Sequence, residues 1–390
     1  MKAQIPLLTS LRGIAALCVA IFHARLIFFP QWKEPLSEYT LFLENSYLWV
    51  DLFFLLSGFV MMHVYKKTFI QGVDASKWKQ FMWLRFSRIY PLFIITLLVL
   101  FLWESIKYSQ NIGFYGGPLL GSWGLTGIPA FEGPFNTFDS LLSNVFMFHA
   151  ITSSSLTWNI ASWSLSVEWL SYMVFPFMVP ILSMRTRITL WIPALVWLIL
   201  FSLNQVHESL DITHGLSSFM RALCGFVLGG WLCNIIVPSN LKRIINNDLV
   251  LLVVLVLSLL LMHIQVAAHL NIMMFALLVF ISSQQERRNT LVFTFFDNRV
   301  TRFLGDISYS LYLWHVVLLL PGIELLNVLM PDLLKVWFTQ TDWSIGLLGV
   351  LTYIMVTIIV STLSFNFIER PLMKKLRTKF VKPSKVLANQ

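Results

Sequence analysis

The fold of this chain is decided by stretches such as LVLLVVLVLSLLLM, which runs from Leu249 to Met262 without a charged side chain. Two further stretches, from Ile14 to Phe29 and from Phe93 to Trp103, are almost as apolar. A helix needs about 20 mostly apolar residues to cross the hydrocarbon core of a bilayer. Each stretch belongs to a segment close to that length, so the sequence predicts helices that span a membrane.

The composition of the whole chain supports the same conclusion. Of the 390 residues, 57% are hydrophobic and only 12% are charged, and the mean hydropathy is +0.73. Soluble domains carry roughly 25% charged residues, so a water-soluble fold is excluded. Because backbone groups in lipid must satisfy their own hydrogen bonds, the spans are helices. We therefore expect an all-α integral membrane protein, with one transmembrane domain at 1–370 and a basic cytoplasmic tail at 371–390.

The apolar segments predict about ten transmembrane helices. They lie at residues 7–29, 47–65, 82–103, 160–182, 188–204, 217–236, 249–264, 269–283, 303–322 and 344–366.

The basic residues predict the orientation of these helices. With the N-terminus in the cytoplasm, most of the 28 lysines and arginines fall in cytoplasmic segments or at cytoplasmic helix ends. Cytoplasmic loops of membrane proteins carry such an excess, so both termini are expected in the cytoplasm. The same bias accounts for the net charge of +9, and no nucleic-acid partner is expected. The three cysteines lie in apolar runs without metal-binding spacing.

Two segments outside the spans stand out. The stretch from Asp139 to Ile151 is too short to cross a bilayer, and both of its flanks fall on the outer side. It is therefore interpreted as a short re-entrant or interfacial helix. The preceding loop, from Glu104 to Phe138, is rich in Gly, Pro and aromatic residues. Long loops often serve as lids or binding loops, although a plain connector fits the sequence equally well.

Charged residues inside a span are costly in free energy, so each one is a functional hypothesis. Arg12 and His23 are eleven positions apart on the first helix, which places them on one face about 16 Å apart along the axis. Arg12 lies near the cytoplasmic end and His23 in the outer third. The alternatives are a membrane anchor for Arg12 and a polar contact between helices for His23.

The second and third helices contain further candidates. Asp51 lies just inside the outer end of the second helix, where a carboxylate needs a partner such as a histidine at similar depth. Ser57 and Gly58 are small, which is ordinarily explained by close helix approach. Arg85 and Arg88 are three positions apart, so both guanidinium groups share one face. Arginine matches phosphate oxygens well, but both could also be cytoplasmic anchors.

Two further ionisable residues lie about one third of the way into their helices from the outside. Glu168 is flanked by Leu165, Val167 and Trp169 and needs a buried partner. His315 could be catalytic or a hydrogen-bonded core histidine. His23, Asp51, Glu168 and His315 are therefore expected to cluster near the outer side, and the arginines near the inner side. This arrangement suggests a tunnel, and no metal site is expected because no two ligands have helical spacing.

Together these features resemble the acyltransferase-3 family of integral membrane acyltransferases. The resemblance covers nearly the whole chain and depends on the order of several motifs. They are Arg12 and His23 with ten residues between them, FFLLSGF at 53–59, RFSRIYP at 85–91, WSLSVE at 163–168, the tyrosine-rich run from Ser308 to His315, and IERP at 368–371. Some members carry an added hydrolase-like domain outside the membrane, and this chain resembles the stand-alone form.

The resemblance implies transfer of an acyl group, often acetyl, from cytosolic acyl-coenzyme A to a hydroxyl of a surface polysaccharide, lipopolysaccharide or lipid-linked glycan. It also implies a bacterial inner membrane and no permanently bound cofactor. The expected roles are coenzyme A phosphate binding by Arg12, Arg85 and Arg88, and general-base catalysis by His23. Glu168 is the first choice and Asp51 the second for the carboxylate that orients His23. Ser57, Tyr309 and His315 are expected to support the substrate or the site.

Two other functions remain open from the sequence. A proton-coupled transporter or flippase of a glycan precursor would use His23, Glu168 and His315 as a proton relay. A glycan polymerase or ligase would also suit a large outer loop. The acceptor, the length of the acyl group and the oligomeric state are not determined by the sequence.

Overall fold

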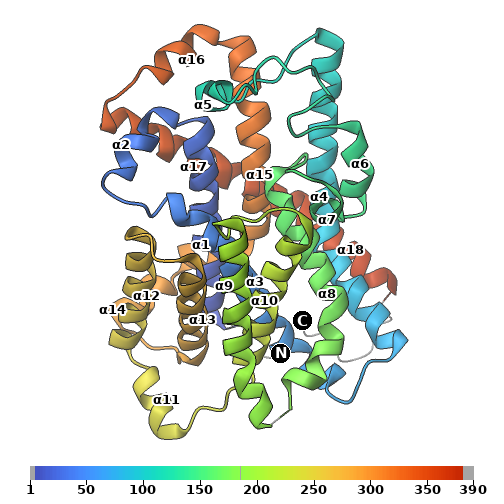
Figure 1. Ribbon diagram of the computed structural model, residues 1–390, viewed down its shortest axis with the longest axis vertical. Coiled ribbons are helices and arrows are strands. Elements are labelled where there is room, and N and C mark those ends of the chain that lie inside the picture. Colours follow the sequence, from blue (N-terminus) through green and yellow to red (C-terminus); the bar gives the residue numbers. More distant parts are fainter. Residues whose placement is uncertain (1–4, 185, 381–390) are drawn as a thin grey trace.

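The computed structural model describes residues 5–184 and 186–380 of the chain (Figure 1). Within these residues every regular element is helical, and the only β-type contact is an isolated bridge between Glu132 and Thr137. The expected all-α architecture is thus confirmed. The expected tail from 371 is helical up to residue 380, and the rest of it lies outside the described residues.

The α-helices are listed here with their bounds: α1 (Pro6–Ile27), α2 (Lys33–Ser37), α3 (Trp49–Phe69), α4 (Ala75–Gln110), α5 (Gly117–Ser122), α6 (Phe138–Val145), α7 (His149–Thr152), α8 (Trp163–Leu182), α9 (Ile192–His207), α10 (Gly215–Leu232), α11 (Ser239–Ile245), α12 (Asp248–His263), α13 (Ala268–Gln284), α14 (Leu291–Phe296), α15 (Arg299–Leu329), α16 (Pro331–Phe338), α17 (Trp343–Ser364) and α18 (Arg370–Phe380). Four 3₁₀ turns (Pro30–Trp32, Glu44–Leu48, Ile160–Ser162 and Arg187–Trp191) and one π-helical turn (Phe365–Glu369) complete the set.

All ten predicted spans coincide with apolar helices. Among the described residues, eight helices are long and apolar enough to cross a membrane, and a ninth span results if the bent pair α11 and α12 is counted as one. The tenth, α13, is apolar but shorter, with 17 residues. The apolar side chains of α17 that face outward, such as Leu347, Leu351 and Met355, are more than half exposed, as expected for contact with lipid.

Two helices are longer than hydropathy predicts. α4 has 36 residues and α15 has 31, so α4 extends for about 54 Å and exceeds the bilayer core. Hydropathy detects only the apolar middle of such a helix, whereas polar residues that favour helix extend it at both ends. As a result, the first residues of the predicted outer loop belong to the last turns of α4.

The site is positioned mainly by the pairing of α1 with α15, the most extensive helix contact in the described part of the chain. The two helices cross at Gly13 and Gly305, where a side-chain carbon on Gly13 would lie 2.6 Å from the Gly305 nitrogen. A carbon on Gly305 would lie 2.2 Å from the carbonyl oxygen of Thr9. Such close backbone approach brings the polar face of α1 against that of α15. Gly58 has the expected packing role, because it allows α3 to lie against the Phe226 carbonyl of α10.

The segment predicted as one short helix contains two. α6 has an exposed apolar edge formed by Phe138, Leu142 and the adjoining Phe146, which suits a membrane interface. A residue with positive φ, Met147, then turns the chain toward α7. There the buried ring of His149 stacks on Phe93 of α4, with a centroid distance of 6.1 Å. The segment is therefore exposed and apolar in its first part, as the predicted interfacial helix would be, and enclosed by protein in its second.

A buried ionic cluster attaches the outer loop to the bundle. The ammonium of Lys107 lies 2.6 Å from a Glu104 oxygen and 2.8 Å from a Glu324 oxygen. The two carboxylates also accept hydrogen bonds from the backbone amides of Phe131 and Tyr115, at 3.2 and 3.3 Å. The loop is thus bonded to both α4 and α15, which favours the interpretation of an ordered binding loop over that of a plain connector.

Candidate active site

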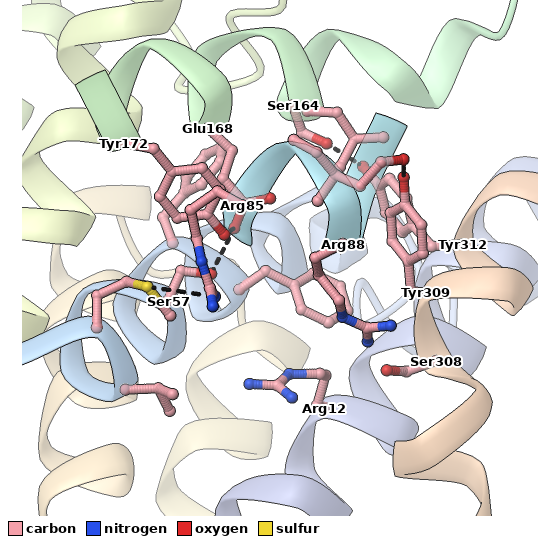
Figure 2. A pocket seen from close by; sticks show the side chains of 16 residues that line it. Arg12, Ser57, Arg85, Arg88, Ser164, Glu168, Tyr172, Ser308, Tyr309 and Tyr312 are labelled. Carbon is pink, nitrogen blue, oxygen red and sulfur yellow. Dashed lines mark hydrogen bonds between the residues drawn. The ribbon is translucent and has the colours of Figure 1, made fainter. Parts of the chain in front are cut away.

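A cavity within the helical bundle gathers most of the predicted polar residues (Figure 2). Five helices line it: α1, α3, α4, α8 and α15. The predicted residues that it brings together are Arg12, Ser57, Arg85, Arg88, Glu168 and Tyr309. Three guanidinium groups and one carboxylate line this cavity, here called the arginine cavity, so its lining side chains carry an excess of positive charge.

Arg88 is held by a carboxylate that sequence reasoning did not assign. Its guanidinium donates to Glu369, whose second oxygen accepts a hydrogen bond from the Ser310 hydroxyl at 2.6 Å. The guanidinium also lies over the ring of Tyr309, 5.5 Å from its centroid. Glu369 is almost fully buried, whereas Arg88 keeps 28% of its side chain exposed. One part of the guanidinium is thus anchored and another part remains accessible from the cavity.

Arg85 and Arg12 have no carboxylate partner in the described residues. Arg85 donates to the Tyr65 hydroxyl at 2.9 Å and stacks near that ring. Arg12 forms no hydrogen bond or ion pair with a described residue, although Arg88 lies close enough to repel its charge and Glu168 and Asp306 lie close enough to attract it. Three arginines around one cavity, two of them without a carboxylate in direct contact, are suited to an anion.

Glu168 lies in the arginine cavity and not beside His23. One of its oxygens accepts hydrogen bonds from the Ser57 and Tyr172 hydroxyls, both at 2.6 Å (Figure 2). Because these two hydroxyl groups already donate hydrogen bonds to the Glu168 carboxylate, it has partners without His23. The prediction that Glu168 orients His23 is therefore not supported by this geometry. Ser57, which was expected to serve mainly close packing, instead points its hydroxyl at this glutamate.

Asp51 is occupied by a different partner. Arg221 of α10 binds it through two parallel contacts, Nε to Oδ1 at 2.9 Å and Nη2 to Oδ2 at 2.6 Å. Both side chains are almost completely buried. A permanently charged, bidentate guanidinium is a stronger partner for a buried carboxylate than a neutral imidazole. The expectation of an Asp51–His23 pair is thus contradicted by the geometry, and Asp51 instead joins α3 to α10.

The partner of His23 is His315. The His23 Nδ1 atom lies 3.0 Å from the carbonyl oxygen of Val19 and 3.3 Å from the His315 Nε2 atom. The His315 Nδ1 atom lies 3.3 Å from the carbonyl oxygen of Leu311. Because a carbonyl only accepts, both Nδ1 atoms carry the proton. His23 Nδ1–H is then shared between the Val19 carbonyl and His315 Nε2, with the carbonyl the nearer acceptor, and the Nε2 lone pair of His23 is left for a substrate.

His23 lines a second cavity, here called the outer cavity, which lies between the bundle and the outer loop. Its polar groups include His23 and Asp211, and its wall is aromatic. The aromatic residues are Phe22, Tyr47, Trp123, Phe135, Trp163 and Tyr312. Trp123 and Phe135 come from the loop held by Lys107, so that loop forms part of the wall.

The residues that the sequence prediction did not assign are Glu369 and Arg221. Glu369 belongs to the IERP motif, but hydropathy places it just past the last predicted span at 344–366. A carboxylate there is expected to face water and to have no desolvation cost, so it did not stand out. Arg221 lies near the beginning of the span predicted at 217–236, where a basic side chain at a helix end is ordinary, so it did not stand out. In the described part of the chain, no group of three or more His, Cys, Asp or Glu side chains is arranged to hold a metal ion.

The fold and the two cavities define a class of protein: a helical membrane protein with an arginine-lined cavity and a pair of contacting histidines beside a second, aromatic cavity. Comparison with known proteins identifies the family. A family model described as an acyltransferase domain matches residues 6–365, and the chain belongs to this family. The predicted resemblance is thus confirmed.

Individual relatives are more distant. The peptidoglycan O-acetyltransferase OatA of Listeria monocytogenes is 20% identical over 96% of this chain and 56% of its own length. A Rhizobium radiobacter protein named protein 2 in the picA locus is 39% identical over 94 residues, 24% of this chain and 42% of that protein. The chain thus spans about half the length of these relatives. No solved structure matches the chain.

Proposed function

We propose that this protein is a membrane-bound O-acyltransferase that takes an acyl group, acetyl in the first instance, from cytosolic acyl-coenzyme A. The acceptor is a hydroxyl of a cell-surface glycan or glycan precursor, and the membrane is a bacterial inner membrane. The observation that carries the proposal is the pairing of α1 with α15. Arg12 of α1 and Tyr309 of α15 both line the arginine cavity. Farther along the same two helices, His23 of α1 lines the outer cavity and contacts His315 of α15.

The arginine cavity suits the phosphates of coenzyme A. Arg12 and Arg85 have no carboxylate partner among the described residues, and Arg88 is partly exposed beside its bond to Glu369. Arginine binds phosphate oxygens in a bidentate manner. Arg377 of α18 lies close enough to Arg85 and Arg88 for the charges to interact, which adds to the positive potential at this side.

The histidine pair suits general-base catalysis. The acceptor oxygen attacks the thioester carbonyl carbon while the Nε2 atom of His23 takes the hydroxyl proton. The new C–O ester bond forms as the C–S bond breaks, and the departing thiolate of coenzyme A then takes that proton from the imidazolium. His315 holds the Nδ1–H of His23, so it keeps the imidazole in the basic tautomer throughout. His315 thereby has the orienting role that the sequence suggested for a carboxylate.

The outer cavity suits a sugar. Aromatic side chains such as Trp123, Trp163 and Tyr47 offer faces against which a sugar ring packs, and Asp211 offers a hydrogen-bond acceptor. The names of the relatives support this part, since the Listeria protein is named a peptidoglycan O-acetyltransferase.

The proposal is tested by coenzyme A release. Purified protein in nanodiscs is supplied with acetyl-coenzyme A and a crude cell-envelope acceptor, and thiol release is measured for wild type, His23→Ala and Arg88→Ala. His23→Ala is expected to lower the rate by roughly 10²–10⁴-fold, and Arg88→Ala to raise the KM for the donor. The matched controls are His207→Ala and Arg243→Ala, which remove exposed residues of the same types.

The rival transporter function makes the opposite prediction. A proton-coupled transporter would consume no thioester and would not be stabilised by coenzyme A. A folded His23→Ala protein with the wild-type rate of thiol release would overturn the proposed base. A wild type that neither releases thiol nor gains thermal stability from acetyl-coenzyme A would overturn the donor site.

A further inference from the structure

One side chain lies at the boundary between the two cavities. Of the described residues that line the arginine cavity and the outer cavity, Tyr312 is the only one common to both. It is located on α15, three positions before His315. The ring of Tyr312 is therefore the point at which the linings of the two cavities meet.

Tyr312 is held in place from three helices. Its hydroxyl lies 2.7 Å from the Ser164 hydroxyl of α8 (Figure 2). It also lies 3.0 Å from the carbonyl oxygen of Ala161. Its ring meets Phe53 of α3 edge to face, with a centroid distance of 5.6 Å. The ring of His315 lies 5.7 Å away on the other side. The tyrosine is 6% exposed, so it forms a fixed partition.

We infer that Tyr312 is the partition past which the acyl group is transferred, and that it restricts the donor to short acyl chains. The inference rests on the proposed acyltransferase function. The tyrosine exchanges no proton or electron pair with the substrate. It acts by size, because a small acetyl thioester reaches His23 beside the ring, whereas a longer chain meets the ring itself.

The position also predicts a second consequence. The linings of the arginine cavity and the outer cavity share Tyr312, and removal of its ring is expected to widen the connection between them. Water from the outer side would then reach a thioester bound on the arginine side. Hydrolysis of the donor without any acceptor would therefore increase, while binding of coenzyme A by the arginines would not change.

The test uses Tyr312→Ala and Tyr312→Leu, with Tyr90→Ala as the matched control. Tyr90 is a partly buried tyrosine of α4 that lines neither cavity. Rates of thiol release from acetyl-, butyryl- and hexanoyl-coenzyme A are measured with and without the cell-envelope acceptor. Binding of coenzyme A is measured separately by calorimetry.

For the wild type and Tyr90→Ala, acetyl is expected to react at least about tenfold faster than hexanoyl. For Tyr312→Ala this ratio is expected to fall by about tenfold and acceptor-independent hydrolysis to rise, with the Kd for coenzyme A within about twofold of wild type. The Leu variant keeps an apolar side chain in the bundle and serves if the Ala variant does not fold.

An unchanged ratio and unchanged hydrolysis in a variant that binds coenzyme A would overturn the partition and leave the proposed function intact. Failure of the wild type to bind coenzyme A would overturn the proposed function and the partition with it.

Discussion

At the residue scale, the buried charges of this protein are bound by opposite charges from distant parts of the sequence. Asp51 is bound by Arg221, and Arg88 is bound by Glu369. The two pairs differ in exposure, since the first is closed to solvent and the second opens on the arginine cavity. Removing one partner of a buried pair destabilises a protein because a charge is left uncompensated. In the Arg88–Glu369 pair, which opens on the arginine cavity, a bound anion could replace the carboxylate as the partner of Arg88.

Glu369→Gln tests this possibility. Without a ligand, the variant is expected to unfold at a lower temperature, by a loss of roughly 1–3 kcal/mol, because Arg88 loses a charged hydrogen bond. Coenzyme A is expected to raise the midpoint of the variant by more than that of wild type, because a phosphate replaces the carboxylate beside Arg88. The measurement is thermal unfolding in detergent with and without coenzyme A. Glu286→Gln, which removes an exposed partner of Lys242, is the control, and equal shifts in all three proteins would contradict the prediction.

His149 makes the stability depend on pH. Its burial lowers the pKa to about 4, whereas an unfolded histidine has a pKa of about 6.5. Between these values the unfolded chain binds a proton that the folded chain does not, so stability falls as the pH falls, by up to about 1.4 kcal/mol per pH unit. The unfolding midpoint at pH 7.5 and 5.0 should therefore drop further for wild type than for His149→Gln. Identical drops would mean that His149 does not titrate in this way.

The residues of the site were predictable from the sequence in type but not in pairing. A charged side chain inside a span costs free energy, which singled out four residues in the sequence: Arg12, Arg85, Arg88 and Glu168. All four line one cavity. The pairing of carboxylates with cations depends on how each helix is rotated about its axis and on how deep it lies in the membrane, to within one helical turn. The sequence does not specify these quantities, and for this reason His315 rather than Glu168 lies beside His23.

At the element scale, the packing of α1 on α15 controls the site. The helices touch through backbone at Gly13 and Gly305, which leaves no room for a methyl group. Glycine is otherwise unfavourable inside a helix by about 1 kcal/mol relative to alanine. Its presence at this crossing is therefore explained by the close approach, which fixes the rotation of both helices and with it the contact between His23 and His315.

Gly305→Ala is expected to destabilise the protein by about 1–3 kcal/mol, because the added carbon would meet the Thr9 carbonyl oxygen. Activity is expected to fall as well, since α15 would shift relative to α1. The matched control is Gly322→Ala on the same helix, where the nearest atom is 3.9 Å away. That change should be neutral or slightly stabilising through helix propensity. Thermal unfolding of both variants checks the prediction, and equal midpoints would refute it.

The helices themselves were largely predictable, because most of the apolar runs approach the length that a bilayer requires and carry few charges. The interruptions were not. The π-helical turn at Phe365–Glu369 directs the carboxylate of Glu369 toward Arg88 and Ser310, and α18 then packs on α4, where Trp83 donates to the Leu376 carbonyl. These features follow from tertiary contacts, and no local periodicity indicates them.

At the scale of the whole molecule, the basic residues predict a single orientation in the membrane. Lys242 of α11 and Asp332 of α16 lie in exposed segments that the positive-inside bias assigns to opposite sides. The proposed function requires this orientation, since acyl-coenzyme A reaches the arginine cavity only from the cytosol.

Single cysteines at these two positions test the orientation. In a background without Cys18, Cys224 and Cys233, Asp332→Cys should react with a membrane-impermeant maleimide in spheroplasts. Lys242→Cys should react only after the membrane is permeabilised. The reverse pattern would place the arginine cavity on the outer side and exclude a cytosolic donor.

The ion pair between Asp51 and Arg221 also has a consequence for how the protein is made. The two residues are 170 positions apart, and ribosomes synthesise about 5–20 residues per second. For roughly 10–30 s after α3 emerges, its carboxylate therefore has no guanidinium to bind. The first helices therefore cannot adopt their final packing when they enter the membrane. We expect α3 to stay in contact with the insertion machinery until α10 has been synthesised and Arg221 can bind Asp51.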